Sequence, residues 1–269
     1  MLSLVVAVLL GLLQGLTEFL PVSSSGHLVL AQSLVPGFSQ PGVLFDVALH
    51  LGTLVAVCIY FWQDLWAMFL SLFSTEREET VASRRLLWLL IVGSMPTAVI
   101  GALFREQFEA MFHDVSGAGV WFIITGILLF LTDRVLTQGR GLAAMRLLDA
   151  LVIGIAQGLA IIPALSRSGT TIAAGVFLGL ERTLLVRYSF LLSIPAIAGA
   201  FVLEVVAHRH DLSEGFDPLA YGVGTLAAGI VGYWSIAVLL TMTRSRRLSV
   251  FAYYCWVVGI LAFLLAARG

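Results

Sequence analysis

The sequence predicts an all-α integral membrane protein made of two inverted-topology repeats, each a re-entrant helical hairpin followed by three transmembrane helices. Of the 269 residues, 59% are hydrophobic and 12% are charged, and the mean hydropathy is +1.00. An ordinary soluble domain has about 45–50% apolar and about 25% charged residues, so a soluble fold of this size could not bury so much apolar surface. Six long apolar stretches and an internal repeat supply the other two observations.

The six apolar stretches each have the roughly 20 residues that a helix needs to cross a bilayer core. The connectors between them hold most of the charged residues, as water-facing loops should, and no soluble domain is hidden among them. The predicted transmembrane helices, six spans in total, are Val43–Trp62, Leu86–Phe104, Gly117–Leu136, Tyr188–Val206, Leu219–Leu240 and Leu248–Ala267.

Two further apolar segments, Leu2–Leu20 and Leu147–Ile162, are each followed by a serine-rich break and a short helical run. The short runs, His27–Val35 and Thr170–Leu180, rise about 1.5 Å per residue and cannot cross the core. We therefore predict two re-entrant hairpins whose tips stay at membrane depth, where irregular backbone is tolerated only if it is buried in protein or lines a polar cavity. The predicted hairpins span residues 2–35 and 147–180.

The two hairpins also resemble each other in sequence. When Gly11–Gly26 is laid on Gly154–Gly169 with a constant offset of 143 residues, 7 of 16 positions are identical, including a Gln-Gly-Leu block and a Ser-x-Ser-Gly block. Three crossings separate the hairpins, and an odd number inverts the second repeat relative to the first, an arrangement known from transporters. Two repeats, residues 1–143 and 144–269, are expected to form one functional unit.

The distribution of arginine predicts the orientation in the membrane. All 15 basic residues are arginine. If both termini lie on the outer side, eleven arginines fall in inner connectors and three on the outer side, as the positive-inside rule requires. A cysteine placed at Gln138 should then react only from inside. The inner set is Arg77, Arg84, Arg85, Arg134, Arg140, Arg146, Arg182, Arg187, Arg244, Arg246 and Arg247, and the outer set is Arg105, Arg209 and Arg268.

Both hairpin tips lead from serine-rich backbone into the start of a short helix. Unpaired N–H groups and the positive end of the helix dipole favour an anion at such a helix N-terminus. Two tips that enter from opposite sides would converge on one pocket, and their hydroxyl, imidazole and guanidinium groups suit phosphate. The tips are Ser23-Ser24-Ser25-Gly26-His27 and Ser166-Arg167-Ser168-Gly169-Thr170-Thr171.

Arg167 is the most distinctive of these residues because it is the only arginine outside a connector or tail. A charge at membrane depth is costly unless it is paired. Its planar guanidinium matches a phosphate with two parallel hydrogen bonds. The alternative is a structural role, in which Arg167 binds backbone carbonyls or neutralises Glu18.

Gln14 and Glu18 are four residues apart and share one face of the first arm. Their amide and carboxylate oxygens form a modest cluster of the kind that holds Mg²⁺ or Ca²⁺ when phosphate and water complete the shell. Two alternatives stay open, because Glu18 could instead pair with Arg167 and Gln14 could form a hydrogen bond between helices.

His27 follows Ser24 by three residues, so one helix face can present both side chains. A nucleophile needs either a basic nitrogen or a hydroxyl with a base beside it, and this pair offers each option. A helix-packing role for His27 is the alternative. Asp46 and His50 are interpreted as a local cap pair, with a place in a second layer around the site as the alternative. Glu204 is expected to reach the interface, and solvated loops are expected to hold His113, His208 and His210.

Three segments together match the motif set of a known family. Gln14-Gly-Leu-Thr-Glu18 matches a (Glu/Gln)-x-x-x-Glu motif, Phe19-Leu-Pro-Val-Ser-Ser-Ser-Gly-His27 follows it, and Pro163-Ala-Leu-Ser-Arg-Ser-Gly-Thr-Thr171 matches Pro-Gly-x-Ser-Arg-Ser-x-x-Thr. Over essentially its whole length the chain resembles the undecaprenyl-diphosphate phosphatases of the bacitracin-resistance type, integral membrane enzymes of bacteria and archaea.

The resemblance implies removal of the terminal phosphate from undecaprenyl diphosphate, which recycles the lipid carrier for peptidoglycan and other cell-wall polysaccharides, confers bacitracin resistance and requires a divalent cation. It implies Glu18 as metal or phosphate ligand, Ser24 and His27 as candidate nucleophiles, and a phosphate cradle of Arg167, Ser166, Ser168 and Thr171. Ser23 and Ser25 join the cradle from the first tip, and Gln14 joins Glu18 at the metal. For the mechanism, we predict attack at the terminal phosphorus by His27, with Ser24 as the competing nucleophile and His27 then its base.

Two positions depart from the family pattern. Gln14 stands where many members have Glu, which removes one metal-binding charge and puts the strength or identity of the metal in doubt. Ala164 replaces the motif glycine, which is expected to stiffen that turn without touching the chemistry.

The resulting hypothesis is a multi-pass enzyme of the bacterial cytoplasmic (inner) membrane with both termini on the periplasmic side. Its expected partners are the polyprenyl diphosphate substrate and the bilayer, with no nucleic acid, and a homodimer is allowed. The alternative function is an inverted-repeat transporter or polyprenyl-phosphate flippase that binds phosphate without cleaving it. A membrane scaffold without chemistry is hard to reconcile with a buried arginine among so many hydroxyl groups.

Overall fold

A computed structural model describes residues 3–38, 43–73, 78–112, 114–135, 139–207, 217–244 and 248–267. Predictions that fall on Leu2, Arg77, His113, Leu136, Gln138, His208, Arg209, His210, Arg246, Arg247 and Arg268 lie outside these ranges. The helices of the first half are α1 (Leu4–Phe19), α2 (Ser24–Ser33), α3 (Leu44–Tyr60), α4 (Trp62–Ser71), α5 (Glu78–Leu103), α6 (Arg105–Met111) and α7 (Val115–Thr132). The second half holds the 3₁₀ turn η1 (Leu142–Ala144), α8 (Leu147–Leu159), α9 (Arg167–Phe177), α10 (Arg182–Ala207), α11 (Pro218–Arg244) and α12 (Ser249–Ala266).

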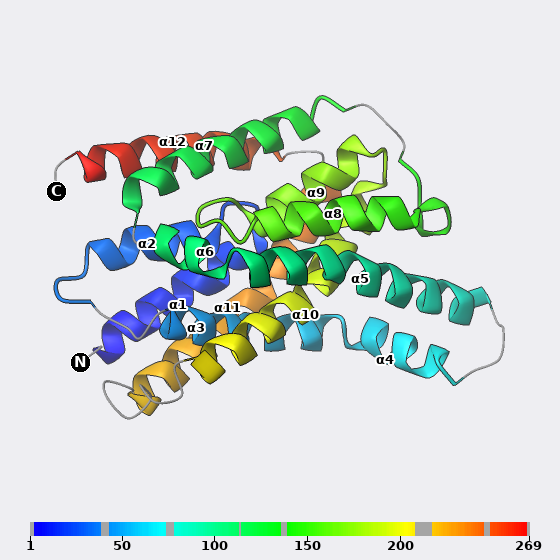
Figure 1. Ribbon diagram of the computed structural model, residues 1–269, viewed down its shortest axis with the longest axis horizontal. Helices are drawn as coiled ribbons and strands as arrows, with labels where there is room; N and C mark the ends of the chain where they lie inside the picture. The colour runs from blue at the N-terminus through cyan, green and yellow to red at the C-terminus, as the bar shows by residue number, and fades with distance from the viewer. Residues whose placement is uncertain are drawn as a thin grey trace.

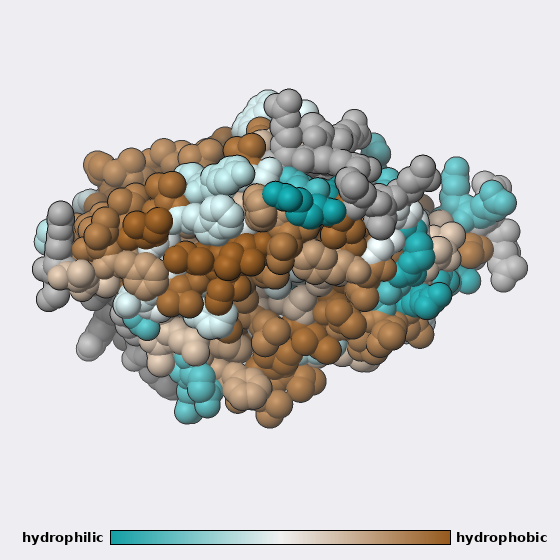
Figure 2. Space-filling model, turned by 90° about the horizontal axis from the view of Figure 1, so that it is seen from above, coloured by the Kyte–Doolittle hydropathy of each residue, from teal (hydrophilic) through white to brown (hydrophobic). Residues whose placement is uncertain are grey.

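The described ranges form the all-helical fold of a multi-pass membrane protein. Five of their helices are long and apolar enough to cross a membrane, and α3 with α4 makes a sixth span if that bent pair counts as one. The helices run roughly along the long axis of the molecule, and both termini lie at the same end (Figure 1). Apolar side chains cover much of the face seen in Figure 2, as expected of a surface that faces lipid rather than water.

The first predicted span, Val43–Trp62, corresponds to α3, and the chain bends by 69° where α3 meets α4. The helix α4 lies within the predicted connector, and one side of it exposes Trp62, Trp66 and Phe69. Amphipathic aromatic side chains of this kind favour the membrane interface. An ion pair between Arg187 and Asp64 fastens α4 to the start of α10.

The two hairpins enter the fold from opposite ends, α1–α2 from the end that holds the termini and α8–α9 from the other (Figure 1). Close contacts between glycines seat each first arm: a Cβ on Gly11 would lie 2.3 Å from the carbonyl oxygen of Gly224 in α11, and a Cβ on Gly154 would lie 2.0 Å from that of Gly93 in α5. Only glycine permits such an approach of two backbones. The arms α1 and α8 therefore pack tightly along α11 and α5.

The second arms begin three residues earlier than predicted, at Ser24 and Arg167 rather than at His27 and Thr170. The cause is helix capping, because the hydroxyls of Ser23 and Ser166 accept backbone N–H groups of the first turn. Serines predicted to lie in a break thus start the helices. As a result the residues with chemistry occupy the first turns of α2 and α9.

Candidate active site

The two hairpin tips touch each other inside the protein. The Ser168 hydroxyl donates to the carbonyl of Leu20 at 3.3 Å, and a Cβ on Gly26 would lie 2.6 Å from that of Ala164. Thr125 of α7 fixes the second tip, since its hydroxyl donates to the Ala164 carbonyl and accepts from the Ser166 N–H, both at 3.1 Å. Residues about 143 positions apart therefore share one buried site.

Each tip contains one non-glycine residue in the left-handed region of backbone conformation. Ser23 has φ of 66° and Ala164 has φ of 67°. Such a conformation costs an ordinary residue roughly 1–2 kcal/mol and persists only where the surroundings enforce it. The Ala164 value supplies the physical reason for glycine in the corresponding family motif, because glycine adopts this conformation without strain.

Glu18 is the centre of the polar cluster. It lies at the end of α1, is 7% exposed, and accepts hydrogen bonds at Oε2 from Gln14 Nε2 (2.9 Å) and from the Ser24 hydroxyl (2.5 Å). His50 Nε2 lies 3.3 Å from the same oxygen, and Arg167 donates to Oε1. A carboxylate buried to this degree requires such partners, and one of them, Ser24, carries a hydroxyl that can act as a nucleophile.

Arg167 reaches Glu18 from the opposite hairpin. It is the first residue of α9, its side chain is 15% exposed, and its other terminal nitrogen donates to the carbonyl of Ser189 at 3.4 Å. The structural alternative for Arg167, a pair with Glu18, is thus present. Arg167 also lines the cavity described below, so its guanidinium is within reach of a bound anion.

His50 belongs to the site. In the sequence analysis this position was only the alternative interpretation of His50. Its Nδ1 is 2.7 Å from the carbonyl of Asp46, which only accepts, so Nδ1 carries a proton and Nε2 faces Glu18. The predicted local hydrogen bond with Asp46 is present, but the predicted cap is not, because the N-cap of α3 is Val43 and makes no side-chain hydrogen bond; the His50 ring also lines the cavity. An i, i+4 pair of ionisable residues inside an apolar span was the available signal.

His27 does not reach the site, contrary to its predicted role as nucleophile. Its Nδ1 lies 2.7 Å from the Ser23 carbonyl and its Nε2 lies 2.8 Å from the Tyr254 hydroxyl of α12. The ring stands edge-on to Phe122 at 5.1 Å between centroids and is only 7% exposed. The face of α2 that carries His27 packs against α7 and α12, so the imidazole points away from the cavity.

The predicted phosphate ligands separate into two groups. Ser23, Ser24, Ser25, Ser166 and Arg167 line the cavity. Ser168 and Thr171 do not, because Ser168 binds the Leu20 carbonyl and the Thr171 hydroxyl bonds to Ser189 Oγ at 2.6 Å and to the Arg167 carbonyl at 2.8 Å. These two residues hold the tip and α9 in place rather than face a ligand.

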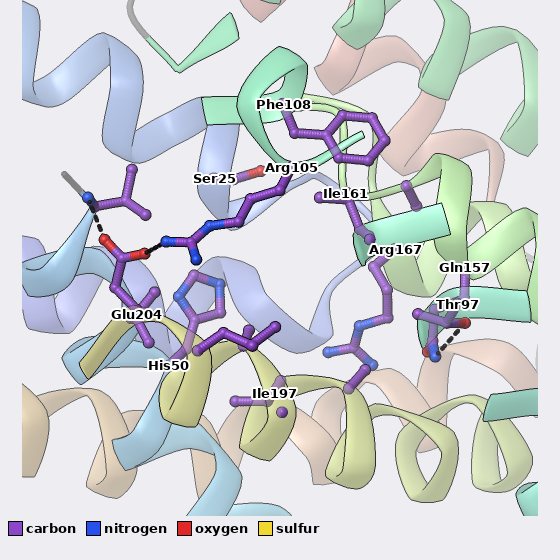
Figure 3. Close-up of a pocket in the computed structure, with 18 of the residues that line it drawn as sticks. Ser25, His50, Thr97, Arg105, Phe108, Gln157, Ile161, Arg167, Ile197 and Glu204 are labelled. Carbon is purple, nitrogen blue, oxygen red and sulfur yellow. Dashed lines mark hydrogen bonds and ion pairs between the residues drawn. The ribbon is translucent and has the colours of Figure 1, made fainter. Parts of the chain in front are cut away.

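The cavity has a volume of about 420 Å³ and lies between the two tips, α3, α5, α6 and α10. Its walls are mainly apolar, with small residues such as Ala98 and Gly101 on α5 and Gly199 on α10. Figure 3 shows Arg167 on one side and Arg105, bound to Glu204, on the other. Glu204 is 4% exposed and accepts from the Val43 N–H at 2.9 Å, so it does not reach the interface as predicted.

The predicted metal site fits the described residues poorly. Glu18 is the sole carboxylate of the cluster and already accepts from Gln14, Ser24 and Arg167. The Gln14 amide turns its nitrogen toward Glu18, which leaves its oxygen buried without a partner and off the cavity wall. The described ranges contain no group of three His, Cys, Asp or Glu residues able to hold a metal ion. The cluster therefore does not provide the coordination shell of a hard cation, which takes six or more oxygen ligands.

Comparison with known proteins gives one consistent result. The family model described as "Bacitracin resistance protein BacA" matches residues 7–261. A protein of Syntrophotalea carbinolica named undecaprenyl-diphosphatase is 44% identical over 261 residues, which cover 97% of this chain and 98% of that protein. Proteins of the same name from Halothermothrix orenii (43% over 262 residues, 96% of each chain) and Methanosphaera stadtmanae (38% over 281 residues, 99% of each chain) are similar along their whole length.

Proposed function

Because this chain belongs to the BacA family of bacitracin resistance proteins, we propose that it is a membrane phosphatase that hydrolyses undecaprenyl diphosphate to undecaprenyl phosphate and phosphate. One observation carries the proposal at the level of the site. A serine, a carboxylate and an arginine from two different hairpins meet at one side of a cavity whose walls are mainly apolar, with Arg105 and Glu204 on the other side. Such a cavity suits a lipid that carries a diphosphate.

The cavity is at the small end of the range for ligand pockets, roughly 300–1,000 Å³, which hold a single drug-sized molecule, so it does not enclose a whole C55 chain. A volume of about 420 Å³ accommodates a diphosphate and the nearest isoprene units. The rest of the tail therefore stays in the bilayer. This division of the substrate favours recycling of a membrane-bound carrier for cell-wall synthesis.

Ser24 is the nucleophile in the mechanism that we propose. The Ser24 oxygen forms a bond to the terminal phosphorus while the bond from that phosphorus to the bridging oxygen breaks, and undecaprenyl phosphate leaves with the bridging oxygen. The Ser24 proton passes to Glu18, its hydrogen-bond acceptor at 2.5 Å. Water then attacks the phosphoserine, dihydrogen phosphate departs, and the Ser24 oxygen regains the proton from Glu18.

Arg167 changes partner in this mechanism. In the free enzyme it neutralises Glu18, whereas a bound diphosphate brings several negative charges and competes for the guanidinium. Once Arg167 grips the terminal phosphoryl oxygens, Glu18 loses a cation and becomes a stronger acceptor for the Ser24 proton. Phosphoryl transfer depends mainly on positioning and on charge stabilisation of this kind.

A divalent cation bound with the diphosphate would neutralise part of its charge, and Glu18 would be the carboxylate of the described cluster able to contact it. The poor fit of the Gln14–Glu18 cluster to a resident ion supports this version over a cation held by the free enzyme.

The architecture that we propose is two inverted repeats with the active site open to the outer side. The shared motifs 143 residues apart, the entry of the hairpins from opposite ends and the pairing of α1 with α11 and of α8 with α5 support it. Figure 1 places α6, which begins at Arg105, toward the end that holds both termini. The first turns of α5 and α10, the end of α7 and the start of α8 lie at the opposite end. In sequence these segments hold or adjoin Arg84, Arg85, Arg134, Arg140, Arg146, Arg182 and Arg187. The positive-inside rule then assigns the termini to the periplasmic side of the inner membrane.

Phosphate release by the purified protein in detergent tests the function. We expect turnover of undecaprenyl diphosphate and of farnesyl diphosphate, with loss of activity in excess chelator. Binding of the diphosphate without phosphate release would instead indicate a transporter or flippase.

Cysteine labelling in sealed vesicles tests the orientation. After Cys58 and Cys255 are replaced by alanine, Gly141→Cys should react only from inside and Ser116→Cys only from outside. The reverse pattern would contradict the proposed topology.

A further inference from the structure

His27 and Tyr254 connect the C-terminal helix to the strained turn before the proposed nucleophile. A carbonyl oxygen only accepts, so the 2.7 Å contact with the Ser23 carbonyl requires a proton on His27 Nδ1. In the neutral imidazole Nε2 is then the acceptor, and the Tyr254 hydroxyl donates to it at 2.8 Å. No ring nitrogen is left with a free lone pair.

The carbonyl that His27 binds belongs to a residue with an unfavourable backbone conformation. Ser23 has φ of 66° and also accepts the Gly26 N–H through its side chain at 3.4 Å. The next residue is Ser24, whose hydroxyl meets Glu18, and Ser25 follows on the cavity wall. Any relaxation of Ser23 toward ordinary φ values would rotate both serines away from their present positions.

The contacts around the imidazole leave it little freedom. The rings of His27 and Tyr254 are nearly parallel, with planes 9° apart and centroids 5.6 Å apart, and Phe122 of α7 stands edge-on to His27. These helices hold α2 from the side opposite to the cavity. We propose that His27 and Tyr254 act as a brace that holds the Ser23 turn strained and thereby positions Ser24 for attack; both are positioning residues. The inference rests on the proposed function.

Side-chain geometry provides variants that separate a brace from a nucleophile or base. In His27→Asn the amide nitrogen occupies the place of Nδ1 and can still donate to the Ser23 carbonyl, whereas His27→Ala cannot. A brace predicts that the Asn variant keeps kcat within about tenfold of the parent, while the Ala variant loses roughly 100-fold, with KM for farnesyl diphosphate little changed in both. A nucleophile or general base predicts that both are equally inactive.

Tyr254 supplies the second arm of the experiment. Tyr254→Phe removes only the hydroxyl and should lower kcat by about threefold to tenfold, as expected for the loss of one neutral hydrogen bond. Added to His27→Asn it should have no further effect, because its partner is already absent. Tyr253→Phe is the matched control, since the Tyr253 ring packs on Phe130 and Trp256 rather than on His27.

The pH profile and the parent activity complete the test. His27→Asn should keep the limbs of the parent kcat profile, because the brace neither gives nor takes a proton in the reaction. Inactive His27→Asn together with unchanged Tyr254→Phe in an active parent would overturn the brace and leave the proposed function standing. A parent that releases no phosphate would overturn both. If His27→Ala fails to fold in a thermal melt, the other two variants decide the question.

Discussion

Compared position by position at an offset of 143 residues, the α1–α2 and α8–α9 hairpins agree in the residues that build their backbones and differ in the charged residues and the proposed nucleophile. Gly11 and Gly154 both press against a neighbouring helix, and Ser23 and Ser166 both cap the second arm. Glu18, however, corresponds to Ile161, and Ser24 corresponds to Arg167. One scaffold therefore carries a serine and a carboxylate in the first hairpin and a guanidinium in the second.

The difference explains why the site needs both hairpins. Neither hairpin alone holds a buried charge with its partner, because Glu18 and Arg167 neutralise each other only across the two tips. In the second hairpin Gln157 corresponds to Gln14. Its amide nitrogen donates to the Thr97 hydroxyl and to the Leu192 carbonyl. The role of the second hairpin is to stabilise helix packing and to present one cation.

Removal of the proposed nucleophile should have the largest effect on kcat, because only the first hairpin carries a nucleophile in our proposal. We expect Ser24→Ala to lower kcat by on the order of 10³-fold or more. Ser33→Ala, at the exposed end of the same helix, should leave the rate unchanged. A trapped phosphoenzyme that survives acid would support Ser24, whereas one that is stable to alkali and labile in acid would restore His27 as the nucleophile.

The next largest effect should come from the cation of the second hairpin. Arg167→Lys keeps the charge but loses the rigid two-pronged contact. If Arg167 binds phosphoryl oxygens in the transition state, the loss should cost about 2–4 kcal/mol, or roughly 10²–10³ in rate. The measurement is turnover of the Lys and Ala variants, with melts to verify folding. A folded Lys variant within a few-fold of the parent rate would make Arg167 only the counter-ion of Glu18.

A smaller effect is expected from restoring the missing carboxylate. Gln14→Glu places a second carboxylate beside Glu18 and should create a resident cation site, visible as a melting temperature that rises with Mg²⁺ in the absence of substrate. For a chain of this size, about 1 kcal/mol of binding free energy raises the melting temperature by roughly 2–4 °C. Gln157→Glu is the matched control, because Ile161 supplies no second carboxylate there. A parent that already responds to Mg²⁺ without substrate would contradict the proposal that the cation arrives with the diphosphate.

The smallest effect concerns the strained residue of the second tip. Ala164→Gly relieves a left-handed conformation worth about 1–2 kcal/mol, partly offset by roughly 0.5–1 kcal/mol of added chain entropy in the unfolded state. A gain of about 0.5 kcal/mol with unchanged kcat is therefore expected from denaturation and turnover assays. Ala174→Gly, at an ordinary helical position of α9, should instead lose about 1 kcal/mol. A destabilised Ala164→Gly protein would mean that the Ala164 methyl group packs more favourably than its backbone strain costs.

Most of the fold could be predicted because its signals are local. Apolar length identified the long helices, and the short second arms identified the hairpins. The starts of the two second arms were missed, because a serine-rich segment has the same composition whether it forms a break or a helix cap. The helix α4 was also missed, since Gln63 and Asp64 interrupt the apolar run and marked the segment as a connector.

The sequence by itself determined the class of the protein and marked Glu18, Ser24 and Arg167 as candidate site residues, because a carboxylate, a serine-rich break and an arginine stand out in segments that are otherwise apolar. Only the tertiary structure decided which faces of those helices meet the cavity. His27 and His50 lie on different helices, and helical periodicity places each on a face of its own helix without saying what that face contacts. Packing of α2 against α7 and α12 turned His27 away from the cavity, while packing of α3 beside α1 brought His50 to Glu18.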